Sequence, residues 1–405
     1  MGPHPGEPID PATTAPLGST PMRDAGPDAA LLEQTLFEIK RVIVGQHNMV
    51  ERLLVGVLAR GHCLLEGVPG IAKTLAAETL ARVVGGTFAR IQFTPDLVPS
   101  DIMGTRIYRP SSERFDVELG PVMANVVLAD EINRAPAKVQ SALLEVMAER
   151  HVSIGGTTYA VPEPFMVLAT QNPIESEGVY NLPEAQRDRF LMKIDIDYPS
   201  PNEELSILYR MSVDPPVARQ TLDPQRVRAL QDTADQIFVH HAIAEYAVRL
   251  VVATRDPASF GLEDLTPLIA YGASPRATLG LIAAARALAL LRGRSYTVPG
   301  DVRDIARDVM AHRLGLSFDA LADGVAATSI IDRVLGAIPQ PRIAPRQYAE
   351  PGQAEPGQYP RAGEPESGRQ SEPGQYPGRQ QDPEAGARGD RGSLPPGAGK
   401  DQESA

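Results

Sequence analysis

Short apolar segments alternate with segments of helical spacing between residues 62 and 197, and this alternation restricts the possible folds more than any other feature of the chain. Helical spacing is found between several of the apolar runs, as at 74–84 and 136–149. Apolar strands that alternate with helices form a parallel sheet covered on both faces. The predicted strands are 62–66, 88–93, 126–130, 165–170 and 191–197.

Two stretches interrupt the alternation, and both have the pattern of a hairpin. Residues 104–120 contain two short strand-like runs around a Pro-Ser-Ser turn. Residues 151–161 contain Gly155-Gly156, where a positive φ costs little and a tight turn is expected. We therefore predict two β-hairpins inserted into the α/β domain.

The strand signal ends near residue 200, and segments of helical spacing follow. Both ends of the chain are rich in Pro, Gly and polar residues and cannot bury enough apolar area to offset the entropy of ordering. For the C-terminal tail, we favour a passive solubilising role over a docking motif. The predicted organisation is a disordered segment 1–27, an α/β core 28–200, an all-helical domain 201–338 and a disordered tail 339–405.

Composition narrows the functional classes. The net charge of -12 argues against nucleic acid as the main partner. A single cysteine, Cys63, excludes an intramolecular disulfide and fits a reducing cytosol. No apolar run is long enough to span a bilayer, and the N-terminus lacks the pattern of a signal peptide. We expect a cytoplasmic protein.

The segment "EGVPGIAKT", residues 66–74, has the pattern of a phosphate-binding loop with one change. The general pattern G-x-x-x-x-G-K-[ST] begins here at Gly67 and ends at Lys73-Thr74, but Ala72 replaces the second glycine. A strand precedes the loop and a helix follows it, so backbone N–H groups and the helix N-terminus can bind phosphate. Alanine needs only to lead into the helix and is small enough to do so. The alternative is a Gly/Pro turn with a chance Lys-Thr pair.

Two later strands end in polar residues. "VVLADEINR", residues 126–134, ends in Asp130 and Glu131, which suit a Mg²⁺ shell and a base that polarises water. The apolar strand in "LATQNP", residues 168–173, ends near Asn172, which could contact a γ-phosphate or orient the water. The alternatives are a solvated acidic loop for the first segment and an Asn-Pro turn for the second.

Three arginines are further candidate site residues, and for one of them, Arg276, an anion partner would supply a missing favourable interaction. Arg187 and Arg189 lie in "LPEAQRDRF", residues 182–190. Arg276 follows the predicted N-cap Ser274 and Pro275, so its charge opposes the helix dipole. Ordinary surface arginines are the alternative.

These motifs resemble the MoxR-type AAA+ ATPases over roughly residues 30–335. The resemblance rests on "VIVGQ", "EGVPGIAKT", "QFTPDLVPSDIMG", "GPVMANVVLADEINRAPAKVQSALLEVMAER", "ATQNPIESEGVYNLPEAQRDRF" and "GASPRATL". It implies a P-loop NTPase core with strand order 5-1-4-3-2, a small all-α lid, bound ATP and Mg²⁺, and a hexameric ring. The alanine before the lysine is a feature of this family.

The resemblance also assigns residue roles. It implies that Asp130 and Thr74 hold Mg²⁺, that Glu131 orients water, that Asn172 and Arg276 are sensors, and that Arg189 acts on ATP in the next subunit. Arg187 stands where an aliphatic residue is commoner, and its role is open. The implied ATP-binding residues are Val44, Gly45, Gly67, Val68, Pro69, Gly70, Ile71, Ala72, Lys73, Thr74 and Leu75.

The family implies a chaperone-like remodeller whose clients are other proteins, often beside von Willebrand factor A domain proteins. The two hairpins would shape a central pore, and residues 94–104 are a candidate loop for client contact. Two other readings stay open: a nucleotide-dependent scaffold with slow turnover, and a nucleic-acid motor, which the acidic charge disfavours.

Overall fold

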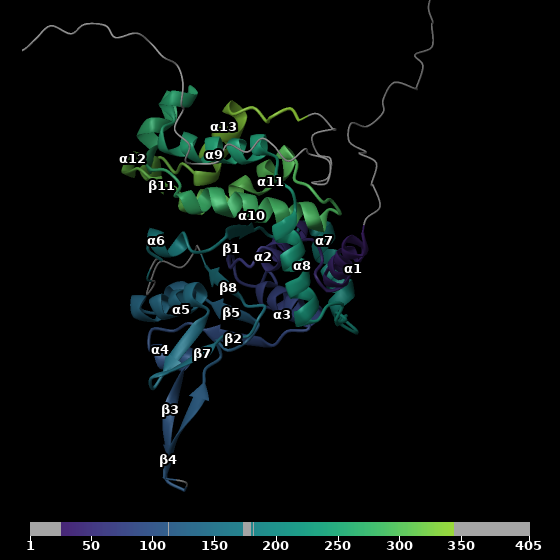
Figure 1. Ribbon diagram of the computed structural model, residues 1–405, viewed down its shortest axis with the longest axis vertical. Coiled ribbons are helices and arrows are strands. Elements are labelled where there is room, and N and C mark those ends of the chain that lie inside the picture. Colours follow the sequence, from purple (N-terminus) through teal and green to yellow (C-terminus); the bar gives the residue numbers. More distant parts are fainter. Residues whose placement is uncertain (1–25, 112, 173–179, 181, 344–405) are drawn as a thin grey trace, which may run out of the picture. The chain divides into compact units, whose positions relative to one another are not determined.

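The structure is a computed structural model that describes residues 26–111, 113–172, 180 and 182–343 (Figure 1). The predicted tail 339–405 lies almost wholly outside the described residues, as do residues 1–25 of the predicted N-terminal segment.

A five-stranded parallel sheet forms the centre of the α/β part. It consists of β1 (Cys63–Gly67), β2 (Phe88–Gln92), β5 (Val126–Asp130), β8 (Met166–Gln171) and β9 (Met192–Ile196) in the order β2-β5-β8-β1-β9. If these five strands are numbered 1 to 5 along the chain and the order is read from β9 to β2, it is 5-1-4-3-2. The fold predicted from the alternation and from the family resemblance is therefore confirmed.

Helices cover both faces of the sheet (Figure 1). One face packs with α1 (Pro27–Val42), α2 (His47–Leu58) and α3 (Lys73–Val83), and the other packs with α4 (Pro99–Met103) and α5 (Ala137–Glu149). Successive residues of β1 alternate between the two apolar clusters, since Leu65 belongs to the first and Leu64 to the second. This two-sided burial is the reason that the strands read as continuous apolar runs.

Both predicted hairpins are present. The first pairs β3 (Gly104–Arg109) with β4 (Arg114–Leu119), and the second pairs β6 (His151–Ile154) with β7 (Thr157–Ala160). Figure 1 shows the first hairpin extending away from the sheet. The rings of Tyr108 and Phe115 contact each other across it in a tilted arrangement with centroids 5.2 Å apart, and both side chains are exposed.

The segment after β9, called the lid below, is mainly helical, as predicted, and also contains a short two-stranded sheet. Strands β10 (Ile269–Tyr271) and β11 (Gly315–Leu316) pair in antiparallel fashion. The 3-10 turns are η1 (Ile132–Arg134) in the core and η2 (Ala258–Phe260), η3 (Glu263–Leu268) and η4 (Ala311–Arg313) in the lid. The remaining helices are α6 (Glu184–Arg187), α7 (Pro201–Met211), α8 (Pro224–Gln236), α9 (His241–Arg255), α10 (Pro275–Leu291), α11 (Pro299–Met310), α12 (Phe318–Ala322) and α13 (Ala327–Ala337).

Helix α10 is the element around which the lid packs. It contacts α8, α9 and α11 of the lid and also α1 and α2 of the core. Small buried residues such as Ala277, Gly280 and Ala284 allow these helices to approach closely. One apolar cluster therefore extends from the core into the lid. Among the described residues, no helix combines the length and apolarity needed to cross a membrane.

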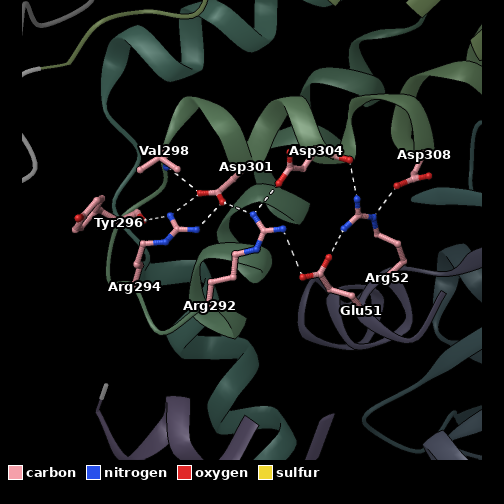
Figure 2. A network of polar contacts seen from close by, with 9 residues as sticks. All are labelled: Glu51, Arg52, Arg292, Arg294, Tyr296, Val298, Asp301, Asp304 and Asp308. Carbon is pink, nitrogen blue, oxygen red and sulfur yellow. Dashed lines mark hydrogen bonds and ion pairs between the residues drawn. The ribbon is translucent and has the colours of Figure 1, made fainter. Parts of the chain in front are cut away.

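A chain of ion pairs also joins α2 to α10 and α11 (Figure 2). Arg52 on α2 pairs through Nε with Asp308 Oδ2 at 2.6 Å and donates through Nη2 to the Asp304 carbonyl at 2.6 Å. Arg292, just after α10, contacts Glu51 at 3.5 Å. Burial raises the pKa of the Asp308 carboxyl, and the Arg52 charge acts against that shift.

Asp301 anchors the lid end of this network. Its carboxylate is fully buried and accepts hydrogen bonds from Arg294 Nη2 at 2.6 Å and from the Val298 backbone N–H at 2.8 Å. A buried carboxylate of this kind is favourable only while its donors remain in place.

We predict that Asp301→Ala lowers the free energy of unfolding by about 2–3 kcal/mol, because it leaves Arg294 without its carboxylate and the α11 N-terminus without its cap. Chemical denaturation measures this loss. Asp214→Ala, at an exposed position, is the control and should change stability by less than about 0.5 kcal/mol. Equal effects of the two variants would contradict the role given to Asp301.

Candidate functional site

The loop between β1 and α3 is held in an unusual backbone conformation. Gly70 has φ 84°, and Ala72, the residue before Lys73, has φ 62° and ψ 24°. We expected Ala72 only to lead into the helix, but it occupies the left-handed region that favours glycine. This conformation explains why the general pattern has a glycine at the position before the lysine. An L-residue in this conformation costs about 1 kcal/mol.

The two glycines of the loop serve different purposes. A Cβ on Gly67 would lie 2.6 Å from the Ile196 carbonyl oxygen, so Gly67 permits close contact between the loop and β9. A Cβ on Gly70 would meet no heavy atom within 4 Å, so only its positive φ requires glycine. The space beside Gly70 is open, as a loop that receives a phosphate requires.

Lys73 begins α3 and points back along the loop. Its Nζ donates to the Gly67 carbonyl at 2.7 Å. Burial lowers the pKa of its ammonium group, whereas the charges of Asp130 and Glu131 act in the opposite direction. The structure thus places the lysine and the two acids near enough to interact, as the sequence motifs predict.

Asp130 ends β5 and is held by both neighbouring strands. Its Oδ1 accepts from Thr170 Oγ1 at 2.6 Å, and its Oδ2 accepts from Arg90 Nη2 at 2.6 Å. Thr170 lies on β8 and Arg90 lies on β2. Both carboxylate oxygens of Asp130 are therefore engaged by protein groups in this structure.

The backbone of Glu131 is strained. Its φ of 56° lies in the left-handed region, and its backbone N–H donates to Thr170 Oγ1 at 2.8 Å. Its Oε2 accepts from Gln92 Nε2 at 2.7 Å and lies 3.1 Å from Arg134 Nε. Strained residues of this kind persist where the surrounding structure fixes them, and they cluster at functional sites.

Asn172 follows β8 directly and is buried. Because β8 lies between β5 and β1 in a parallel sheet, its carboxyl end shares an edge with Asp130 and with the loop after Gly67. Lys73, Thr74, Asp130, Glu131 and Asn172 thus gather at one edge. Thr74 and Asp130 supply the hydroxyl and carboxylate oxygens that fit Mg²⁺, which usually takes one or two protein ligands besides phosphate and water.

The segment Val44-Gly45 lies toward the same edge. Gly45 has φ 65°, and a Cβ there would lie 2.5 Å from Glu203 Oε1. The adjacent Gln46 donates through Nε2 to the carbonyl of Asp197, just beyond the carboxyl end of β9, at 2.8 Å. The start of α7 therefore packs against the residues predicted to border the base.

Arg189 and Arg276 lie at the opposite edge of the sheet, the one formed by the amino ends of the strands. Arg189 precedes the start of β9, and both arginines line a cavity of about 540 Å³ together with Gly61 and His62, which precede β1. The five residues of β1 separate this cavity from the phosphate loop by about 16 Å. The structure does not bring these two arginines to the loop of their own chain.

The remaining arginine of the motif, Arg187, pairs within its own helix. Its Nη2 lies 3.9 Å from Glu184 Oε1 in α6. Its position gives no indication that it competes with Arg189, whose Nη1 donates to the Leu144 carbonyl at 2.8 Å.

Several polar residues of the site do not belong to the motifs found in the sequence. Arg90 and Gln92 lie on β2, which pairs with β5 in a register that sets Gln92 beside Asp130. The signal that could find them is the strand order, because it makes β2 the neighbour of the acidic strand end. Asp188 and Arg313, at the arginine edge, carry no such signal because their contact joins residues far apart in the chain.

Comparison with known proteins agrees with this geometry. Residues 62–192 match the family described as "ATPase family associated with various cellular activities (AAA)", and residues 264–334 match the AAA lid domain. The chain is 61% identical to chaperone MoxR1 of Mycobacterium tuberculosis, over 84% of this chain and 91% of the relative. It is 35% identical to protein MoxR of Paracoccus denitrificans, over 74% and 93% of the two chains. A crystal structure from Cytophaga hutchinsonii, described as that of a "putative ATPase", superposes with a TM-score of 0.74 at 44% identity. The match covers 78% of this chain and 96% of the other.

We predict that Ala72→Gly leaves the free energy of unfolding unchanged or raises it by up to about 1 kcal/mol, because glycine tolerates the left-handed conformation. Ala77→Gly, at a buried position inside α3, is the control and should cost about 1 kcal/mol or more. Denaturant titration of both variants distinguishes them. Equal losses would mean that Ala72 is not strained.

Proposed function

Because the chain belongs to the MoxR family of AAA+ ATPases, we propose that it hydrolyses ATP at a site formed by two copies and uses the reaction to remodel partner proteins. The observation that carries this proposal is the separation of the candidate residues into two edges of one sheet. The loop and acids lie at one edge and the two arginines at the other.

The loop edge would bind the nucleotide. Backbone N–H groups of residues 67–74 and the α3 N-terminus favour phosphate oxygens, and Lys73 adds a positive charge. Val44 and Gly45 would border the base. Thr74 and Asp130 would hold the metal, and a bound Mg²⁺ would neutralise charge on the transferring phosphate.

Glu131 would act as the base. Its carboxylate would accept a proton from the attacking water while Asn172 orients the phosphate or the water. In this structure Glu131 is engaged by Gln92 and Arg134, and Asp130 is engaged by Arg90. Turnover therefore requires that these contacts break when nucleotide binds.

The arginine edge would complete the site of a neighbour. A chain that offers its loop edge to one copy and its arginine edge to another forms a head-to-tail contact, which closes into a ring when the rotation permits. We propose a hexamer. Arg189 and Arg276 would then approach the terminal phosphate across the interface and stabilise charge in the transition state.

We place the motor in residues 28–338, with a core at 28–200 and a lid at 201–338, and we propose that the protein is cytoplasmic. The β3–β4 hairpin exposes Ile107, Tyr108 and Phe115, a surface suited to an apolar protein segment and to lining a pore. Residues 94–104, which include α4, stay a candidate client loop, and a von Willebrand factor A domain protein is a candidate partner.

One observation favours a second candidate function, a nucleotide-dependent scaffold with slow turnover. Both acids of the site are occupied by side chains of the same chain, so an unassembled copy would hold ATP without rapid cleavage. A turnover rate that a client protein increases supports the remodelling function. A rate that stays slow in the presence of clients favours the scaffold.

We expect Glu131→Gln to bind ATP with unchanged affinity and to turn over at least about tenfold more slowly, because the base is lost. Lys73→Ala should instead lose tight binding. Glu145→Gln, an exposed residue of α5, is the control and should match the unchanged protein. Binding of a fluorescent ATP analogue and phosphate release measure the two steps, and unchanged turnover of Glu131→Gln would exclude the assigned role.

Arg189→Ala should retain ATP binding and lower turnover at least about tenfold, whereas Arg187→Ala should have little effect. Mixing Arg189→Ala chains with Glu131→Gln chains should restore part of the activity, because some interfaces then contain an intact loop edge and an intact arginine edge. The absence of recovery in the mixed rings would count against the shared site.

A further inference from the structure

The carboxylate of Asp188 lies where the core meets two separate parts of the lid. It accepts from Ser274 Oγ, the N-cap of α10, at 2.9 Å and from Arg313 Nε, at the end of η4, at 2.9 Å. Arg276 Nη1 lies 3.3 Å away. This one acidic side chain therefore touches both the start of α10 and the end of η4.

The backbone around Asp188 is bound to the lid as well. Arg313, whose side chain is 3% exposed, donates through Nη2 to the Phe190 carbonyl at 2.6 Å and through Nη1 to the Leu191 carbonyl at 3.1 Å. His312 Nε2 lies 3.1 Å from the same Phe190 oxygen. The segment 188–191 is thus attached to the lid by both side-chain and main-chain contacts.

Arg189 lies between these attached residues, so its position follows that of the lid. Its own side chain is exposed and contacts the neutral Leu144 carbonyl of α5. Within the described part of the chain, no carboxylate pairs with it. Its charge is therefore available to an anion that approaches the cavity.

Arg276 is held more loosely than Arg313. Its side chain is 60% exposed, and its distance to Asp188 is the longest of the three. When Arg276 moves toward another anion, Asp188 keeps its bonds to Arg313 and Ser274 and is not left as an unpaired buried charge. The geometry therefore allows Arg276 to leave Asp188 and bind a phosphate at a small cost in free energy.

We propose that Asp188 is a positioning residue that holds Arg189 and Arg276 side by side and ties both to the lid, so that they meet the terminal phosphate of a nucleoside triphosphate bound to a second copy. This inference rests on the proposed function, since it needs a shared site. Lid movement in one copy would thereby re-aim both arginines at the nucleotide of the next.

Asp188→Asn tests the proposal because asparagine retains the volume and an acceptor for Ser274 but removes the charge. In the assembled protein, kcat should fall at least about tenfold while KM for ATP stays within about twofold, since the loop edge is untouched. The matched control is Glu51→Gln, which weakens another ionic contact between core and lid, the one that Glu51 makes with Arg292 (Figure 2). A similar loss of kcat in Glu51→Gln would mean that weakening any ionic contact between core and lid lowers kcat. That result would overturn the proposal.

Ser274→Gly provides a second variant in case Asp188→Asn does not fold. Glycine retains most N-cap stability but removes the hydroxyl that donates to Asp188. We expect kcat to fall about fivefold with KM for ATP unchanged. An unchanged kcat in this variant, with the ring intact, would overturn the proposal.

Mixing separates the failure of this inference from the failure of the proposed function. Asp188→Asn chains keep an intact loop edge, so Glu131→Gln chains, which keep an intact arginine edge, should restore part of their activity. If Arg189→Ala is rescued in this way and Asp188→Asn is not, the positioning role is wrong and the shared site stands. If neither variant is rescued, the shared site itself fails.

Discussion

The direction of the strands in one parallel sheet determines where every candidate group lies. In such a sheet all carboxyl ends share one edge and all amino ends share the other, so residues that follow β1, β5 and β8 are brought together. Residues that precede β9 are placed about one strand length away. We propose that the phosphate loop and the two acids form half of a catalytic site and that the arginines form a half that only another copy can use. Under this proposal, rapid hydrolysis requires assembly.

The loop edge also carries backbone strain and competing contacts. Ala72 and Glu131 both have positive φ, and the carboxylates of Asp130 and Glu131 are held by Arg90, Gln92 and Thr170. The proposed turnover requires that the contacts of Arg90 and Gln92 with these carboxylates break when nucleotide binds. The lid is joined to the core by a continuous apolar cluster and by ion pairs, among them that of Arg313 with Asp188, the residue before Arg189.

Most of the fold and the loop edge can be predicted from the sequence, because their signals are local. Apolar runs predict the five strands, Gly155-Gly156 predicts a hairpin turn, and "GIAKT" and "LADE" predict the polar residues at two strand ends. The conformation of Ala72 is not predicted in this way, because an alanine, unlike the glycine of the general pattern, does not indicate a positive φ. The roles of Arg90 and Gln92 depend on the register between β2 and β5, and that of Asp188 depends on contacts with residues such as Arg313, more than a hundred positions later. The strand order, which came from the family resemblance, is what turns the isolated motifs into two separate edges.

The most direct test of a site divided between two copies is the dependence of turnover on protein concentration. ATP hydrolysis per chain and ATP binding per chain would be measured at saturating ATP and Mg²⁺ while the protein is diluted through its assembly range, as followed by sedimentation. A divided site predicts that hydrolysis per chain falls steeply as the assembly dissociates, whereas binding per chain persists. Hydrolysis per chain that stays constant down to fully separated chains would contradict the account.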